Sequence, residues 1–199
     1  MHVKRSSHLT GDTMRRQLGT ALIVVAIAAT ATACNNDADA SGGPGAATSA
    51  APAPAASQGG ALSVGGTATL KGKGEGVQVG VTLKSWVDPA QSANKFMKPA
   101  PGKRWVAAQL EIVNTGKAAY SDSPANGVKV VDEKGETFTH SMGEITAGPN
   151  MPASVKLAPG EKTLGYVVVA VPENAKPRSV RFATDSGFGK DTGEWTVTK

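Results

Sequence analysis

The chain has 199 residues and a formal net charge of +5. Residues 1–33 hold four of the 21 basic and one of the 16 acidic residues, so residues 34–199 keep 17 basic and 15 acidic groups, a net charge of +2. These charges alternate in sign along the chain, which excludes the clustered basic face of a nucleic-acid-binding protein. The single cysteine excludes an intramolecular disulfide, so hydrophobic packing must hold the fold together.

The first 33 residues have the pattern of a secretory leader. Arg15 and Arg16 precede an apolar run at 18–29, and small residues follow at 31–33. A positive head, an apolar middle and a small-residue cleavage site predict a signal peptide. The run is short for a bilayer-spanning helix, although the small residues after it could extend it into a retained anchor. Met14 is an alternative start that would give a leader of ordinary length.

The one cysteine follows the leader directly. Ala31-Thr32-Ala33-Cys34 resembles the bacterial lipobox, in which small residues precede an invariant cysteine. The resemblance implies that the Cys34 thiol carries a diacylglyceryl group, with acyl chains such as palmitate, and becomes the first residue of the mature chain. Two or more acyl chains anchor a protein stably, so we expect membrane anchoring on the extracytoplasmic face. The alternative is ordinary leader cleavage that leaves Cys34 as a free thiol.

Residues 35–60 contain no large apolar residue and are rich in Ala, Gly, Pro and Ser. Such a segment buries too little surface to offset the entropy cost of ordering, so it is predicted to be a flexible linker. The predicted organisation is a lipoprotein signal peptide at 1–33, lipidated Cys34 with its linker at 34–60, and one folded domain at 61–199.

From residue 61 onward, apolar residues recur at every second position, which is typical of half-buried β-strands. The segments with this pattern are 77–86, 104–116, 127–140 (two strands around a turn), 179–184 and 194–197. Segment 163–172 is apolar on both faces, which predicts a central strand, and 194–197 is predicted to be a short edge strand. Turn-forming Pro, Gly and Asn residues separate the segments, and no helical period is evident. The prediction is an all-β, immunoglobulin-like two-sheet β-sandwich.

Three stretches of the domain carry a family resemblance. They are "PGKRWVAAQLEIVNTG", "VVDEKGETF" and "LAPGEKTLGYVVVAVPENAKPRSVRF". Together they look like a family of domains of unknown function that occurs in Gram-positive secreted lipoproteins and is grouped with the mycobacterial immunoprotective extracellular protein. The resemblance covers roughly residues 75–185 and implies an immunoglobulin-like sandwich. It implies no catalytic residue, because the family has no agreed reaction.

The residues of the domain offer little for catalysis. His140 is the one histidine after the leader, and nothing around it resembles a nucleophile elbow or an oxyanion loop. The glycines of "KGKGEG" at 71–76 lack the strand-to-helix context of a phosphate-binding loop. The acidic stretches at 121–127 and 132–136 do not reproduce an EF-hand loop, and turn chemistry explains them. We therefore predict a protein that is not an enzyme and has no cofactor.

The sharpest chemical feature is His140-Ser141-Met142, with Met151 after it and Met97 upstream. His140 and Met142 share one face of a strand, and imidazole with thioether suits copper(I). Two adjacent ligands are too few without a third, and the alternative is that the methionines fill gaps in packing while His140 is solvated.

The aromatic side chains suggest a second binding chemistry, a sugar-stacking platform. Its candidates are Trp86, Trp105, Trp195, Tyr120 and Tyr166. The alternative is that Trp86 and Trp105 cover the edges of the core.

Taken together, the sequence predicts a membrane-anchored extracellular lipoprotein. Its sandwich is expected to be a non-catalytic binding or display module of the cell envelope, with an envelope protein or polysaccharide as partner. The alternative is a copper or small-ligand carrier that uses His140, Met142 and Met151.

Overall fold

The computed structural model describes residues 60–198. The predicted leader, Cys34 and almost all of the linker lie outside the described residues and stay predictions. Among residues 60–198, no helix has the length and apolar character needed to span a bilayer.

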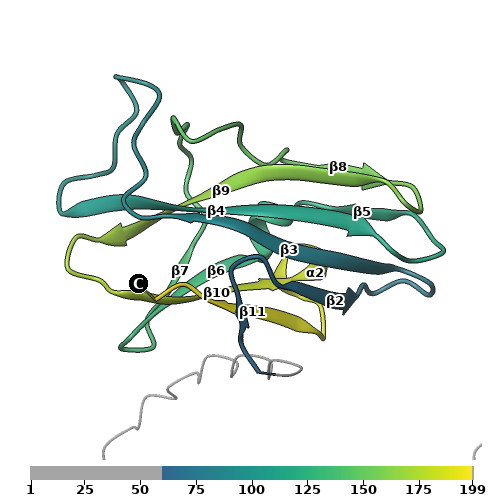
Figure 1. The fold of residues 1–199 in the computed structure, drawn as a ribbon. Helices are drawn as coiled ribbons and strands as arrows, with labels where there is room; N and C mark the ends of the chain where they lie inside the picture. Colours follow the sequence, from purple (N-terminus) through teal and green to yellow (C-terminus); the bar gives the residue numbers. More distant parts are fainter. Residues whose placement is uncertain (1–59, 199) are drawn as a thin grey trace, which may run out of the picture. The chain divides into compact units, whose positions relative to one another are not determined.

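The chain forms two packed β-sheets (Figure 1). The four-stranded sheet has the order β2 (Thr67–Lys71), β3 (Gln78–Val87), β4 (Lys103–Asn114), β9 (Lys162–Pro172). The five-stranded sheet has the order β1 (Leu62–Ser63), β11 (Thr192–Thr196), β10 (Pro177–Ala183), β6 (Val128–Asp132), β7 (Thr137–Thr139). The predicted all-β two-sheet sandwich is confirmed.

Shorter elements complete the described part of the chain. They are the two-stranded sheet of β5 (Tyr120–Asp122) and β8 (Val155–Leu157) and the one-turn helices α1 (Pro124–Gly127) and α2 (Thr184–Gly187). Neither the short strands nor the helices were predicted, because three or four residues are too few to show a period.

The core lies between the two sheets. Alternate residues of β3 and β4 point into it and are fully buried: Val79, Val81, Leu83, Val106, Ala108, Leu110 and Ile112. The second sheet contributes Val128, Val130, Val180, Phe182 and Trp195. The period-two pattern therefore identified the inward face of both long strands correctly.

The β9 strand is apolar on both faces because each face packs in a buried cluster, and not because the strand is central in its sheet. It lies at the end of its sheet, so the prediction of a central strand is wrong. Val167 and Val169 face the main core, while Tyr166 and Val168 join a second buried cluster with Trp105, Ala107, Ile145 and Ala90. The chain after β7 covers the outer face of β9 and buries this cluster.

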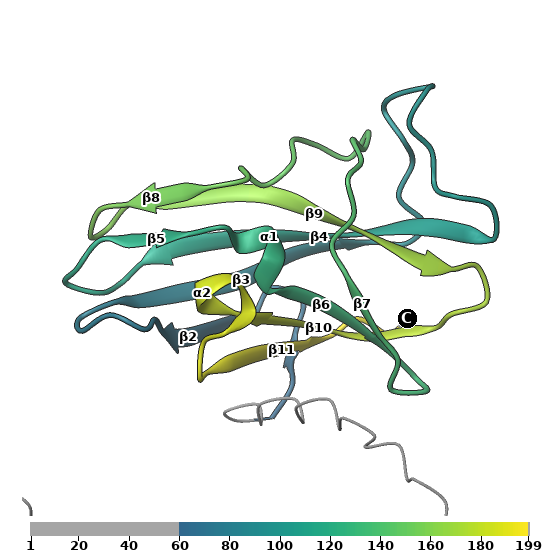
Figure 2. The same ribbon diagram turned by 180° about the vertical axis from the view of Figure 1, so that it is seen from behind.

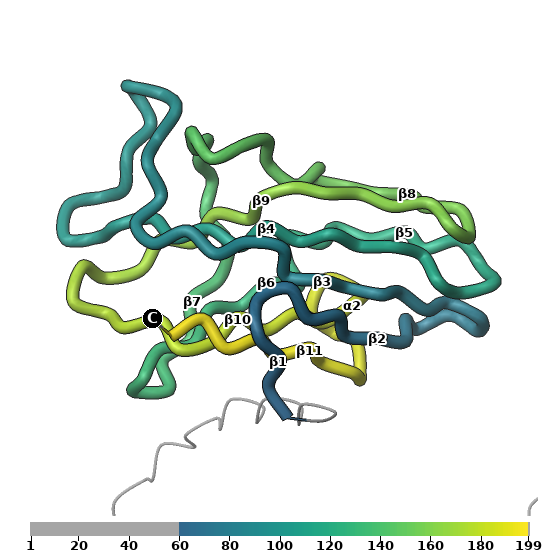
Figure 3. The backbone as a smooth tube through the Cα atoms, in the orientation of Figure 1, coloured from purple at the N-terminus to yellow at the C-terminus, as the bar shows by residue number. Residues whose placement is uncertain are grey.

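The C-terminal strand also differs from its prediction as an edge strand. β1 lies beside β11 in parallel and forms the edge instead (Figure 3). Trp195 is fully buried in the main core, and its indole N–H donates a 2.8 Å hydrogen bond to the carbonyl oxygen of Gly66. A two-residue strand cannot be detected by periodicity, so sequence reasoning could not place β11 inside the sheet.

Candidate functional site

Two long loops rise together above one end of the four-stranded sheet (Figures 1 and 2). Loop 88–102 joins β3 to β4, and segment 140–154 joins β7 to β8; we call them the paired loops. Backbone hydrogen bonds connect them, from Ala93 N–H to the carbonyl of Glu144 (2.9 Å) and from Thr146 N–H to the carbonyl of Gln91 (3.0 Å). The two loops therefore form one structure.

A half-buried ion pair fixes the base of loop 88–102. Arg104 donates to both carboxylate oxygens of Asp88, at 2.8 and 3.0 Å, and to the carbonyls of Pro172, Glu173 and Ala175. The hydrogen bond with Asp88 raises the pKa of Arg104 above its ordinary value, so the guanidinium stays charged. Five hydrogen bonds from one side chain join the loop to the chain that follows β9.

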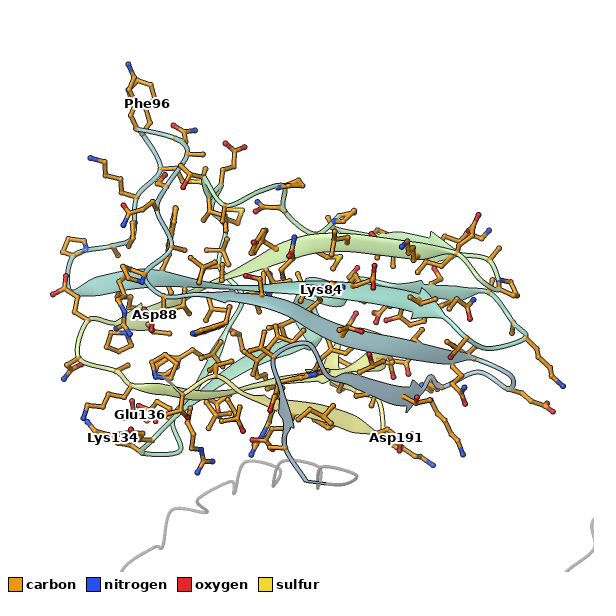
Figure 4. All side chains as sticks on the ribbon, viewed as in Figure 1. Lys84, Asp88, Phe96, Lys134, Glu136 and Asp191 are labelled. Carbon is orange, nitrogen blue, oxygen red and sulfur yellow. The ribbon has the colours of Figure 1, made fainter. Side chains whose placement is uncertain are left out.

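The tip of loop 88–102 holds an aromatic side chain in solvent. The Ser92 hydroxyl lies within hydrogen-bond distance of the carbonyls of Asn94 and Met97, and Asn94 Oδ1 accepts a bond from Phe96 N–H (2.9 Å). Phe96 is 86% exposed at the outermost point of the loop (Figure 4). The Lys95 ammonium lies 4.9 Å from the centre of its ring. The tip is a defined turn that presents Phe96 outward.

The predicted soft ligands come together beside this tip. A cavity of about 550 Å³ lies among the paired loops, α1 and β9, and its lining includes Met97, His140, Met142 and Met151. Met142 is 87% exposed and Met97 is 38% exposed, whereas Met151 is buried and packs in the main core. The structure thus brings Met97, which the sequence placed upstream of the group, to the same cavity as His140, Met142 and Met151.

The backbone of segment 140–154 is held against β9. His140 forms a β-bridge with Val169, Ser141 N–H donates to the carbonyl of Val168 (2.8 Å), and Met151 N–H donates to the carbonyl of Tyr166 (2.8 Å). The main chain at His140, Met142 and Met151 is therefore anchored, while the His140 and Met142 side chains face solvent. Among residues 60–198, no group of three or more His, Cys, Asp or Glu residues is arranged to hold a metal ion.

The predicted aromatic platform is wrong. Trp105, Trp195, Tyr120 and Tyr166 are at most 7% exposed, and Trp86 is half-buried against the main core. The exposed aromatic side chains of residues 60–198 are instead Phe96 and Phe188. Sequence reasoning missed both because each lies in a turn-rich segment without periodicity. The one signal for Phe96 was its position between Lys95 and a second lysine.

The fold and the paired loops define the class of the protein. It is a β-sandwich domain whose loops carry the exposed apolar side chains and line a cavity. More particularly, residues 72–192 match the domain of unknown function DUF4352, so the chain belongs to this family. The predicted membership in a family of domains of unknown function is thereby confirmed. The search of curated proteins found no match.

The chain is also similar to solved structures. The secreted protein MPT63 from Mycobacterium tuberculosis is 16% identical, with 68% of this chain and 95% of that chain covered and a TM-score of 0.47. The yjhA protein from Bacillus subtilis is 11% identical, with 68% and 98% covered and a TM-score of 0.49. A putative lipoprotein (ycdA) from Bacillus subtilis subsp. subtilis str. 168 is 11% identical, with 63% of this chain and 39% of that chain covered and a TM-score of 0.48.

Proposed function

We propose that the protein is a lipid-anchored extracytoplasmic protein whose DUF4352 domain is a non-catalytic binding module of the cell envelope. One observation carries the proposal: Phe96, Met97 and Met142 are exposed on the paired loops, and Met97 and Met142 line a cavity of about 550 Å³. Soluble domains rarely keep large apolar side chains clustered in water, and rigidly held aromatic residues are typical anchors of interfaces. The paired loops would therefore be the surface that meets the partner.

The location rests on the N-terminal sequence. A leader, a lipobox-like Cys34 and a linker form an ordered series that would place the sandwich outside the membrane on a tether. Intact-mass analysis of the protein from membranes of its native host tests this. We expect a mature chain that begins at an acylated Cys34, and we expect Cys34→Ala to remove the protein from the membrane fraction. An unmodified Cys34 on a membrane-bound chain would contradict the proposed anchor.

The binding surface is tested by site-specific photocrosslinking in intact cells. A photoreactive residue at position 96 or 142 should give a covalent adduct with the same partner. A probe at Lys129, which is exposed on β6 of the other sheet, is the matched control. Adducts of equal yield at all three positions would show that the paired loops have no special role.

A copper(I) carrier is a second candidate, and the position of Met97 favours it. Met97 lines the same cavity as His140 and Met142, so it could replace the buried Met151 of the predicted set as a third soft ligand. Both sheets and their core lie within residues 60–198, so a chain of residues 50–199 holds the whole described fold and can be studied without the predicted leader and Cys34. Anaerobic titration with copper(I) against a competing chelator should give binding tighter than micromolar, weakened at least tenfold by Met97→Leu with Met142→Leu. Binding no tighter than micromolar would exclude the carrier.

A further inference from the structure

A second cavity, of about 440 Å³, lies at the other end of the sandwich. It is formed by the end of β2, the loop that leads into β3, and the turn between β10 and β11. Its lining includes Lys71, Lys73, Asp185, Phe188, Lys190 and Asp191. Figure 4 places Asp191 at the end of the molecule opposite Phe96. Phe188 is 89% exposed, so an aromatic ring stands in solvent here as well.

The turn beside this cavity has a strained backbone. Asp185, Ser186 and Gly187 follow one another with φ values of 55°, 57° and 91°. The left-handed region suits glycine but is unfavourable for Asp and Ser, and two such residues in succession are rare. Strain of this kind persists only where the surroundings impose it, and it is concentrated at functional sites.

A buried carboxylate imposes the conformation. Asp122 accepts hydrogen bonds from Ser186 N–H (2.8 Å) and Ser123 N–H (2.7 Å) on one oxygen, and from the Tyr120 hydroxyl on the other. Burial, together with the hydrogen bond to Asp122, raises the pKa of Tyr120, so the phenol remains a donor. The turn is therefore held by a network that starts on a distant strand.

Two further carboxylates connect this turn and the residues after it to the end of β2 and the loop that follows. Asp185 Oδ2 accepts a bond from Lys73 N–H (2.8 Å), and Asp191 Oδ2 accepts one from Lys71 N–H (3.2 Å). At Gly189, a Cβ atom would lie only 2.3 Å from the Thr184 hydroxyl, so no other residue fits without a shift. These contacts fix the backbone on both sides of Phe188, and the Phe188 ring points into solvent.

The lining has the chemistry of a carbohydrate site. The lysines of the lining carry hydrogen-bond donors, its two aspartates carry acceptors, and Phe188 adds an exposed aromatic ring. A sugar ring can stack its C–H face on an aromatic ring while its hydroxyls meet donors and acceptors at the edge. A volume of 440 Å³ lies within the range of ligand sites.

We propose that this second cavity binds a segment of an anionic glycan, a sugar polymer that carries carboxylate or phosphate groups. The three lysines exceed the two aspartates by one charge, and both carboxylates already accept a backbone N–H, which lowers their repulsion of an anion. Phe188 stacks on the sugar, and Lys71, Lys73 and Lys190 bind its anionic groups. This site goes beyond the proposed function, since it uses the other end of the sandwich.

Calorimetric titration of residues 50–199 tests the proposal with three probes. They are oligogalacturonate, poly(glycerol phosphate) and uncharged dextran. We expect one of the charged polymers to bind at least tenfold more tightly than dextran, and the better of the two identifies the source of the negative charge. Phe188→Ala should weaken that binding at least tenfold, and Lys73→Ala with Lys190→Ala should weaken it about fivefold and reduce its salt dependence.

Leu164→Ala is the matched control, because it removes a 48% exposed apolar side chain of β9 that lines neither cavity, and it should leave the affinity unchanged. Circular dichroism checks that each variant is folded. The proposal is overturned if neither charged polymer binds more tightly than dextran, or if Phe188→Ala binds as well as the parent. Because the anchor and the paired loops are tested with other variants, its failure is distinct from failure of the proposed function.

Discussion

The two ends of the sandwich present an aromatic ring to solvent in different ways. At the paired loops, a long excursion of the chain carries Phe96 outward, and the Arg104–Asp88 ion pair closes its base. At the β10–β11 turn, the excursion is short, and Asp122 holds Ser186 in a left-handed conformation beside Phe188. The long loop is held by an ion pair at its base, whereas the short turn is held by hydrogen bonds that offset the cost of its strained backbone. The two ends should therefore respond to different substitutions.

Removing the anchor of the paired loops should have the largest effect. Arg104→Ala leaves Asp88 and three carbonyls without their donor, and the Arg104 and Asp88 side chains are only 22% and 16% exposed. We expect the free energy of unfolding to fall by about 3 kcal/mol, measured by urea denaturation of residues 50–199. The control Lys176→Ala breaks an exposed pair with Glu133, whose two side chains are 76% and 53% exposed, and should cost less than about 0.5 kcal/mol. Equal losses for the two variants would show that Arg104 does not anchor the loop.

Removing the support of the short turn should have a smaller effect. Asp122→Ala leaves the Ser186 and Ser123 amides and the Tyr120 hydroxyl without their acceptor, which should lower the free energy of unfolding by about 2 kcal/mol. Asp122→Asn keeps one acceptor and should lose about half as much. Hydrogen exchange should become faster at residues 184–189 and stay unchanged in loop 88–102. Faster exchange in both regions would contradict the independence of the two ends.

The Tyr120 phenol should make the stability of the turn end depend on high pH. Its pKa is raised in the folded protein, mainly by burial, so folding favours the neutral phenol. This contribution is complete below the unfolded pKa of about 10 and declines as the pH rises above it. Tyr120→Phe should cost about 1 kcal/mol at pH 7 and should flatten the decline between about pH 9 and 11. Tyr166→Phe is the matched control, and a decline that persists in Tyr120→Phe would assign it to another group.

The exposed rings themselves should contribute least to stability. Phe96 and Phe188 are 86% and 89% exposed, so Phe96→Ser and Phe188→Ser should each change the free energy of unfolding by less than about 0.5 kcal/mol. Each variant should nevertheless lose binding at its own end alone, by photocrosslinking at position 142 for Phe96→Ser and by glycan titration for Phe188→Ser. A loss of stability above 1 kcal/mol in either variant would mean that the ring packs in the fold.

Sequence reasoning succeeded where the evidence is local. The inward residues of β3 and β4 were identified because apolar side chains recur at every second position, and the turn after Asp132 was found because Gly135 is suited to its φ of 83°. It failed for β9, since apolar residues on both faces indicate burial without saying what covers the second face. It also failed for the aromatic side chains, because residue type alone cannot show whether a ring is buried.

The candidate site was predictable only in part. His140 and Met142 were grouped because they are two residues apart, and Met97 was named with them, but only the pairing of two loops that are far apart in the sequence brings Met97 to the same cavity. The second cavity was not predicted at all. Two of its three lysines, Lys71 and Lys73, belong to the "KGKGEG" stretch, which lacked a recognised motif, and its aromatic ring is more than 110 residues away from these two.

The amino-acid sequence by itself determined the class of fold, the positions of the long strands and turns, and the prediction of a lipidated Cys34, because alternation, turn chemistry and cleavage motifs act over a few neighbouring residues. The tertiary structure alone decided which loops meet, which rings are exposed and which carboxylate holds a strained turn. Those features depend on contacts such as Asp122 with Ser186, 64 residues apart, and Trp195 with Gly66, 129 residues apart. Such contacts form only when the two sheets pack around a common core, so no local pattern in the chain can specify them.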